Sequence, residues 1–235
     1  MDVPDLRRAA AIVETLDGVP GWLKVGGELF TAAGPEAIAV AAGGAKVFLD
    51  TKFHDIPNTV AGSVAAATRH GVSMLTLHTA GGSAMLRAAR DAAAEAADAC
   101  GKARPALVGV TVLTSFSTAG LKEVGVVVAQ VADQVARLVD LAIAAGLDGI
   151  VASPHEAAAA RRLAGDAPLV IVTPGIRPSG WPADDQARAA SAGDAIVAGS
   201  DLLVVGRPVL RAADPAAAAR DLIGEVERAR AAQRA

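Results

Sequence analysis

Short, continuous runs of apolar residues alternate with longer alanine-rich segments along the whole chain. Continuous apolar runs are typical of strands that are buried on both faces, as in a parallel sheet. Such runs predict strands at residues 22–26, 46–50, 72–78, 106–113, 149–152, 169–173 and 202–206. Helices are expected over residues 5–16, 34–42, 57–69, 82–99, 126–145, 155–164, 183–192 and 215–232. This alternation predicts parallel βαβ units in a single domain over residues 1–235.

The polar residues that interrupt this pattern tend to follow strand ends, which favours a barrel over an open sheet. Asp50, His78 and Arg207 each lie at or just after the end of a different predicted strand. A TIM barrel collects its chemistry from many strand ends, whereas a doubly wound sheet concentrates it at one switch point. Only residues 1–3 precede Pro4, where the first strand of a barrel is needed. We therefore predict an α/β (β/α)8 TIM barrel whose first strand is truncated, or whose true start lies upstream.

Composition narrows the class of protein further. Aromatic residues make up only 3% of the chain and hydrophobic residues 52%, which suits alanine-rich helices around an aliphatic sheet better than an all-β sandwich. A net charge of −3 argues against nucleic acid as the main partner. No apolar run is long enough for a membrane span, and the N-terminus does not resemble a signal peptide, so we expect a cytoplasmic protein. The single cysteine, Cys100, excludes an intramolecular disulfide and a multi-cysteine metal site.

The densest group of charged residues is the segment DTKFHD at residues 50–55. Residues two apart on an extended strand face the same side, so Asp50 and Lys52 should point together, with Lys24 on the preceding strand. A purely structural interpretation makes them an ion pair that closes the barrel end, and makes Asp55 the N-cap of the helix that begins near Pro57. The functional interpretation is an active site, because an alternating array of charges in a buried mouth is costly to keep.

Five blocks, in order along the chain, resemble those of the orotidine 5′-phosphate decarboxylases of the bacterial type. The most specific is DTKFHDIPNTV at residues 50–60. The others are LKVG at 23–26, VTVLTS at 110–115, VTPGIRP at 172–178 and VGRP at 205–208. Together they span essentially the whole chain. The resemblance implies a carboxy-lyase that converts orotidine 5′-phosphate to UMP and CO2, the last step of de novo UMP synthesis, without a cofactor.

The resemblance also implies roles for the charged residues. Lys52 matches the catalytic lysine of the family, which protonates C6 of the pyrimidine, and Asp50 matches the carboxylate set against the substrate carboxylate. Lys24 matches the lysine that joins this network and touches the ribose. Loss of CO2 leaves a carbanion that a neighbouring cation stabilises and then protonates. Asp50 and Asp55 favour the protonated form of Lys52, because they carry the opposite charge.

Further matches concern substrate binding and assembly. Asp2 matches the family residue that binds the ribose, and Thr114 matches one that contacts the pyrimidine. The residues that match the group holding the 5′-phosphate and its closing loop are Arg177, Gln186, Gly206 and Arg207. The segment 178–186, punctuated by Gly and Pro, is the candidate lid. The family positions that reach the active site of a neighbouring subunit match Asp55, Ile56 and Thr59, which implies a homodimer with shared active sites.

Two alternatives stay open at this point. The 3-keto-gulonate-phosphate decarboxylases and hexulose-phosphate synthases share the Asp-x-Lys-x-x-Asp pattern but hold an enediolate on Mg²⁺. They carry an acidic residue where this chain has Lys24, and a lysine there repels a cation. The second alternative is a non-catalytic barrel that binds UMP. His54 and His78, with the two other histidines, lack the spacing of a metal site, so we expect no metal.

Overall fold

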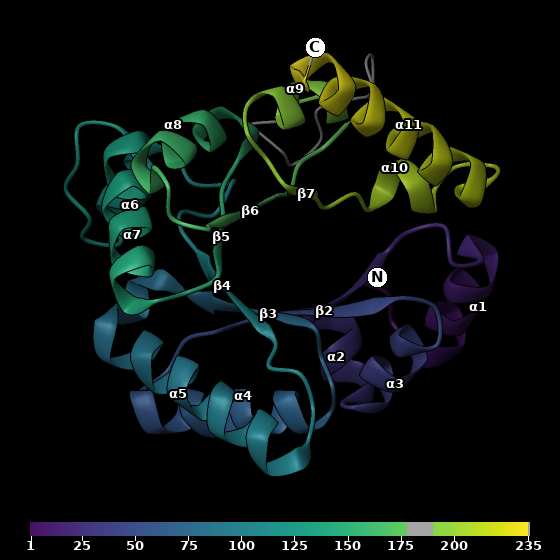
Figure 1. The fold of residues 1–235 in the computed structure, drawn as a ribbon, viewed down its shortest axis with the longest axis horizontal. Coiled ribbons are helices and arrows are strands. Elements are labelled where there is room, and N and C mark those ends of the chain that lie inside the picture. Colours follow the sequence, from purple (N-terminus) through teal and green to yellow (C-terminus); the bar gives the residue numbers. More distant parts are fainter. Residues whose placement is uncertain (178–189, 235) are drawn as a thin grey trace. The chain divides into compact units, whose positions relative to one another are not determined.

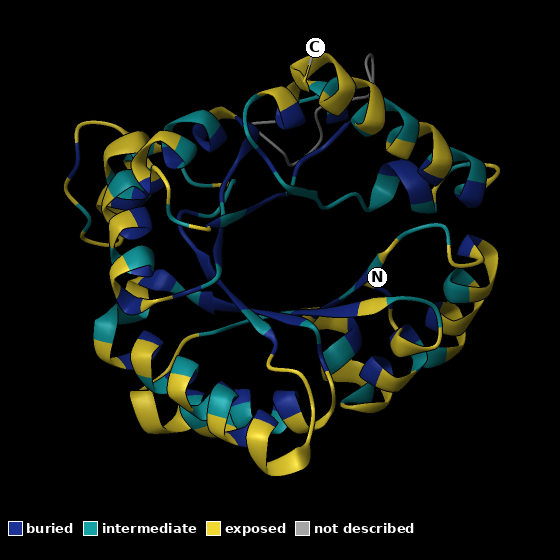
Figure 2. Ribbon diagram, viewed as in Figure 1, coloured by how far each residue is buried: buried dark blue, intermediate teal, exposed yellow. Residues whose placement is uncertain are grey.

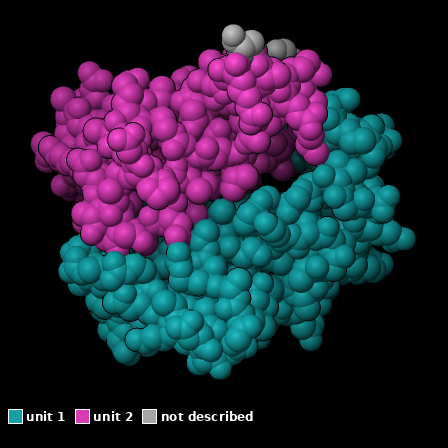
Figure 3. Space-filling model, in the orientation of Figure 1, with its two compact units in different colours: residues 1–107, 206–221 teal, residues 108–205, 222–235 magenta. Residues whose placement is uncertain are grey.

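The computed structural model of the chain describes residues 1–177 and 190–234. Contacts within the chain group these residues into two compact units (Figure 3). The first unit comprises residues 1–107 and 206–221, and the second comprises residues 108–205 and 222–235. Both units are built from parallel strands and helices, in agreement with the predicted α/β class. That the chain forms a single domain stays a prediction.

The first unit is built on parallel strands that pair in the order of the sequence. They are β1 (Trp22–Gly26), β2 (Lys46–Phe53) and β3 (Met74–His78), and β4 (Ala106–Val110) begins at the end of this unit. The backbone N–H of Ala106 donates to the carbonyl of Ser73 at 3.0 Å, which starts the pairing of β4. The strands are mostly buried (Figure 2), as their continuous apolar sequences predict.

Residues 1–3 lie beside β1 in the place predicted for the first strand. The Met1 amino group donates to the Lys24 carbonyl, and the Gly26 N–H donates to the Met1 carbonyl at 3.0 Å. Hydrogen bonds to residues on both sides of Val25 are the pattern of a parallel ladder. Burial, followed by the charge of Lys24, lowers the pKa of the Met1 amino group to about 5. Asp5 caps helix α1 (Leu6–Leu16) directly after this segment.

Besides α1, the helices of the first unit follow β1, β2, β3 or β7 along the chain (Figure 1). They are α2 (Gly27–Ala33), α3 (Glu36–Ala42), α4 (Pro57–Arg69), the 3-10 turn η1 (Thr79–Gly81), α5 (Gly82–Cys100), α10 (Arg207–Leu210) and the start of α11 (Pro215–Arg234). The sequence pattern did not predict α2, a short helix that begins directly at the end of β1. Helices α4 and α5 pack against each other and bury alanine and valine side chains.

The second unit contains the end of β4, together with β5 (Gly149–Val151), β6 (Val170–Thr173) and β7 (Leu202–Leu203), all parallel. Its helices are α6 (Thr118–Glu123), α7 (Val131–Ala145), α8 (Pro154–Ala164), α9 (Ala192–Val197) and the end of α11. Around β6 and β7, a buried cluster of Ile176, Ala192 and Ala195 packs against side chains from β7, the segment after it and α11.

Several boundaries differ from those predicted. The helix expected at 126–145 begins only at Val131, because Gln130 and Asp133 form a capping box there. Most of the helix expected at 183–192 lies outside the described residues, and α9 begins at Ala192. The strands expected at 106–113 and 202–206 are shorter. Their pairing continues as single hydrogen bonds, from Thr111 N–H to Val151 O at 3.3 Å and from Val204 N–H to Thr173 O at 2.9 Å.

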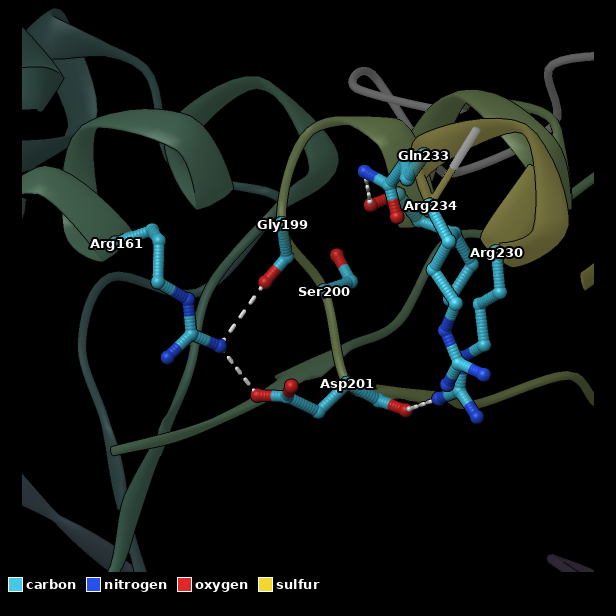
Figure 4. A pocket seen from close by; sticks show the side chains of 8 residues that line it. Arg161, Gly199, Ser200, Asp201, Arg230, Gln233 and Arg234 are labelled. Carbon is cyan, nitrogen blue, oxygen red and sulfur yellow. Dashed lines mark hydrogen bonds and ion pairs between the residues drawn. The ribbon is translucent and has the colours of Figure 1, made fainter. Parts of the chain in front are cut away.

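A polar pocket of about 290 Å³ lies in the second unit, near the start of β7 (Figure 4). Arg161 of α8 donates there to the carbonyls of Leu169 and Gly199 and forms an ion pair with Asp201. Arg230 of α11 donates to the Asp201 carbonyl at 2.9 Å. The contacts to Gly199 and Asp201 connect α8 and α11 to the segment that precedes β7.

Candidate active site

Asp50 lies between two lysine side chains in the first unit. Its Oδ2 is 3.0 Å from Lys24 Nζ, and its Oδ1 is 2.9 Å from Lys52 Nζ. Parallel pairing of β1 with β2 sets Lys24 opposite Phe48 and Gly26 opposite Asp50, so Lys24 and Asp50 lie two register positions apart on neighbouring strands. Only 12% of the Asp50 side chain is exposed, against 36% for Lys52. The contact between Asp50 and Lys52 confirms that these two side chains point together.

The backbone that brings them together is not the plain extended strand that was expected. The pairing of β2 with β3 joins Leu49 to Leu75 and Phe53 to Leu77, so residues 50–52 lie opposite Thr76 alone. The extra residues form an irregular bulge, and Lys52 adopts a left-handed φ of 51°. Bulges of this kind re-aim side chains and are frequent next to active sites. The prediction that β2 ends at Asp50 was also wrong, because it continues to Phe53.

Thr76 completes this arrangement. Its side chain is fully buried in β3, and its hydroxyl accepts a hydrogen bond from the Lys52 N–H at 2.9 Å. The same hydroxyl donates to Asp50 Oδ1 at 3.0 Å. The sequence reasoning missed Thr76, although a signal existed. It is the polar residue inside the apolar run MLTLH, two positions before His78, and therefore on the same face of the strand.

The charges of the array keep Asp50 ionised. Burial alone would raise the pKa of Asp50, but the ammonium groups of Lys24 and Lys52 outweigh burial and lower it. Two ammonium groups around one carboxylate leave the array with an excess of positive charge. Such a site favours an anionic ligand.

His54 and His78 lie beside this array. Their ring centroids are 5.3 Å apart, and the rings are tilted by 39°. Burial, followed by the charges of His54 and Lys52, lowers the pKa of His78, so its imidazole is neutral at pH 7. Within residues 1–177 and 190–234, no group of three His, Cys, Asp or Glu side chains is arranged to hold a metal ion. The absence of a metal from the reaction stays a prediction.

Asp55, Ile56 and Thr59 lie past the end of β2, at the start of α4. Asp55 is exposed, and its Oδ1 accepts a hydrogen bond from the Ile56 N–H at 2.7 Å. The N-cap of α4 is Ile56, with Pro57 in the first turn, so the N-cap interpretation of Asp55 was wrong by one residue. Within the described part of this chain, the ion pairs of Lys52 do not include Asp55. Asp50 is therefore the only carboxylate among the described residues that pairs with Lys52 within its own chain.

Asp2 reaches the end of β1 from the N-terminal segment. Its Oδ1 accepts a hydrogen bond from the Glu28 N–H, in the first turn of α2, at 2.9 Å. Gly26 allows this approach, because a Cβ at that position would lie 2.4 Å from Asp2 Oδ1. The glycine is thus required by the close passage of the Asp2 carboxylate.

The residues expected to bind the pyrimidine and phosphate are distributed over both units. Gly206 is the N-cap of α10 and Arg207 is its first residue, both in the first unit. Thr114 follows β4, and Arg177 follows β6, in the second unit. Arg177 is buried, and its guanidinium donates to the carbonyl of Ile176 at 2.9 Å. Gln186 and the candidate lid from residue 178 onwards lie outside the described residues.

The chain is similar to many proteins of known family. The model of the orotidine 5′-phosphate decarboxylase / HUMPS family matches residues 1–222. An orotidine 5′-phosphate decarboxylase of Moorella thermoacetica is 49% identical over 97% of this chain and 90% of its own length. That of Alkalilimnicola ehrlichii is 48% identical over 99% of this chain and 95% of its own length. The prediction of a carboxy-lyase is therefore confirmed at the level of the family.

Solved structures agree with the sequence comparisons. The crystal structure of orotidine 5′-phosphate decarboxylase from Lactobacillus acidophilus matches with a TM-score of 0.83 and 35% identity, over 96% of both chains. The enzyme from Methanocaldococcus jannaschii, complexed with the inhibitor BMP, matches in fold with a TM-score of 0.73 and 22% identity, over 96% of this chain and 95% of that one. The predicted TIM-barrel fold is thereby confirmed. The chain belongs to the orotidine 5′-phosphate decarboxylase / HUMPS family.

Proposed function

We propose that this protein decarboxylates orotidine 5′-phosphate to UMP and CO2, as the last step of de novo pyrimidine biosynthesis. The observation that carries the proposal is the array in which an ionised Asp50 lies 3.0 Å from Lys24 and 2.9 Å from Lys52. The curated relatives, which match nearly the whole chain, are named for the same reaction.

The proposed reaction uses Lys52 as the proton donor. The bond between C6 and the carboxylate breaks, CO2 leaves, and the electron pair stays on C6 as a carbanion. The ammonium group of Lys52 stabilises this negative charge as it develops, because it is fixed beside the reacting carbon in a partly buried site. Lys52 then transfers a proton to C6, which gives UMP, and the neutral amine regains a proton from water.

Asp50 has two effects in this proposal. As a carboxylate in contact with Lys52, it attracts the ammonium group and holds it in the site until the carbanion forms. Set against the substrate carboxylate, it would also repel the substrate in the ground state, and that repulsion ends as CO2 departs. We assign the larger share of catalysis to stabilisation of the transition state by Lys52. Lys24 completes the charge network and contacts the ribose.

The remaining substrate contacts come from the other residues that match the family. We propose that Asp2 binds the ribose and Thr114 the pyrimidine. The residues proposed to hold the 5′-phosphate are Arg177, Gln186, Gly206 and Arg207. The phosphate is remote from C6, so its binding energy can order the site around the reacting carbon. A guanidinium is suited to this task, because its planar fork matches a phosphate.

We further propose a homodimer with shared active sites. Asp55, Ile56 and Thr59 would reach the site of the neighbouring subunit. Two observations support this assignment: Asp55 does not pair with Lys52 in its own chain, and 67% of Ile56 is exposed at the start of α4. Contact with a partner would remove this apolar side chain from water.

We also propose that the protein acts in the cytoplasm. A chain with one free cysteine, Cys100, fits a reducing compartment. Across the described residues, no helix is both long and apolar enough to span a membrane.

The test is a spectrophotometric decarboxylation assay with orotidine 5′-phosphate, with EDTA and then with added Mg²⁺. We expect turnover in EDTA, its loss in Lys52→Ala, and unchanged turnover in Lys122→Ala, which removes an exposed lysine of α6. Turnover that requires Mg²⁺ would favour the enediolate-forming enzymes of the family instead. Tight binding of UMP without decarboxylation would favour a non-catalytic nucleotide-binding protein.

A further inference from the structure

Thr76 is a buried polar residue at the point where the pairing of β2 with β3 is irregular. Its side chain is 0% exposed, in a strand whose neighbouring residues Leu75 and Leu77 are equally buried. A hydroxyl in such surroundings must form hydrogen bonds to offset its loss of water. Both of its partners, the Lys52 N–H and Asp50 Oδ1, belong to the charged array.

The first hydrogen bond bears on the backbone of Lys52. A φ of 51° is uncommon for a residue other than glycine, asparagine or aspartate, and it persists only where the surrounding structure holds it. In the bulge, the Lys52 N–H lacks the regular ladder opposite it, because residues 50–52 face Thr76 alone. The Thr76 hydroxyl accepts this N–H at 2.9 Å, where a strand carbonyl would otherwise do so.

The second hydrogen bond bears on the carboxylate. Thr76 donates to Asp50 Oδ1 at 3.0 Å, the same oxygen that lies 2.9 Å from Lys52 Nζ. Lys24 pairs with the other oxygen, Oδ2. The plane of the Asp50 carboxylate is therefore set by three donors, of which Thr76 is the only uncharged one among the described residues.

We propose that Thr76 is the positioning residue of the reaction: a single hydroxyl that holds the Lys52 backbone in its left-handed conformation and orients Asp50 toward the lysine. It acts through these two residues and not on the substrate. The kinetic consequence rests on the proposed decarboxylation, whereas the geometric consequence does not.

The kinetic test compares Thr76→Val, which removes the hydroxyl at nearly constant shape, with Thr76→Ser, which keeps it. Thr68→Val is the matched control, because Thr68 is also fully buried and its hydroxyl donates to Val64 O within its own helix, α4. We expect Thr76→Val to lower kcat about tenfold to a hundredfold, the range for a hydrogen bond to a charged group, with the Kd of UMP changed less than about threefold. Thr76→Ser and Thr68→Val should keep kcat within about threefold of wild type.

Two kinetic results would overturn the proposal. One is a Thr76→Val enzyme with the kcat of wild type. The other is a Thr76→Ser enzyme as impaired as Thr76→Val, since the hydroxyl would then not be the group that matters. If Thr76→Val does not fold, Thr76→Ala removes the same hydroxyl without placing a second methyl group against the carboxylate.

The geometric test is a crystal structure of the wild type and of the Thr76→Val or Thr76→Ala protein. We expect Lys52 to leave the left-handed region, or its ammonium group to move away from Asp50 Oδ1, when the hydroxyl is absent. An unchanged φ and an unchanged contact would overturn the proposal, whatever the kinetics. A wild-type protein without decarboxylase activity would overturn the proposed function alone, since this comparison needs no turnover.

Discussion

Lys52 reaches Asp50 Oδ1 at 2.9 Å from a backbone position with a left-handed φ of 51°. The strand that carries both residues therefore bulges between them, and the contact depends on that bulge. An ion pair between residues two apart on a regular strand would form without assistance. This one is held by residues on the neighbouring strands β1 and β3. The geometry of the candidate active site is thus a property of three strands together.

Replacing Asp50 with asparagine should impair catalysis while leaving the shape of the side chain nearly unchanged. The substitution removes the carboxylate that Lys24 and Lys52 share, so the ammonium group of Lys52 loses the ion pair that holds it in position. We expect kcat to fall by about a hundredfold or more, measured by the absorbance change on decarboxylation. Asp91→Asn, in an exposed ion pair with Arg90 on α5, is the control and should retain wild-type kcat. A kcat for Asp50→Asn within about threefold of wild type would contradict the proposed role.

The lowered pKa of His78 predicts how stability depends on pH. In the folded protein His78 binds a proton less readily than in the unfolded chain, whose histidine has a pKa near 6.5. The unfolded state therefore takes up more protons as the pH falls below 6.5, and the free energy of unfolding falls with it. This loss should be absent above pH 6.5 and grow until the pH reaches the lower, folded-state pKa.

His78→Asn should flatten that dependence. Urea unfolding at intervals between pH 5 and pH 8 gives the free energy of unfolding for each variant. We expect the slope of the wild type below pH 6.5 to be reduced in His78→Asn and retained in His70→Asn, which changes an exposed histidine after α4. Equal slopes in all three proteins would show that His78 does not cause the dependence.

Gly26→Ala should displace Asp2. The added Cβ would lie 2.4 Å from Asp2 Oδ1, which is closer than any ordinary contact, so the N-terminal segment has to move. We expect a loss of about 1–3 kcal/mol in the free energy of unfolding, as for other overpacked sites, and a higher KM if Asp2 binds the ribose. Gly27→Ala is the matched control, because a Cβ there meets no atom within 4 Å. Similar losses in both variants would mean that the approach of Asp2 is not the cause.

Shared active sites can be tested by mixing two inactive proteins. Lys52→Ala and Asp55→Ala each damage a different component of the site proposed to lie between subunits. In a mixed dimer, one of the two sites receives both intact residues, so equal mixing should restore about a quarter of wild-type activity. The measurement is decarboxylation after the subunits have been exchanged by dilution or mild denaturant. If exchange is demonstrated by differently tagged chains and activity stays at the level of the single variants, Asp55 does not act across an interface.

Much of the architecture can be predicted from the sequence, because it depends on local patterns. The run WLKVG predicts β1 at Trp22–Gly26, where the structure has it, since a strand buried on both faces is continuously apolar. The blocks around Lys24 and residues 50–60 are specific enough to identify the family and the principal charged residues. One helix start, that of α7, was predicted less well than the others. The start of α7 is set by a reciprocal capping interaction between Gln130 and Asp133, which hydrophobic periodicity does not report.

The sequence by itself determined the fold class, the family and the presence of Lys24 on one strand and of Asp50 and Lys52 on or just after the next. Only the tertiary structure decided how the last two meet, and that Thr76 holds them. The physical reason is that strand periodicity is a property of one segment, whereas a bulge exists only in the register of two paired strands. For the same reason, Asp55 lies near Lys52 in the sequence but does not pair with it in its own chain. Thr76 lies far from Lys52 along the chain, yet its hydroxyl accepts the Lys52 N–H and holds the Lys52 backbone.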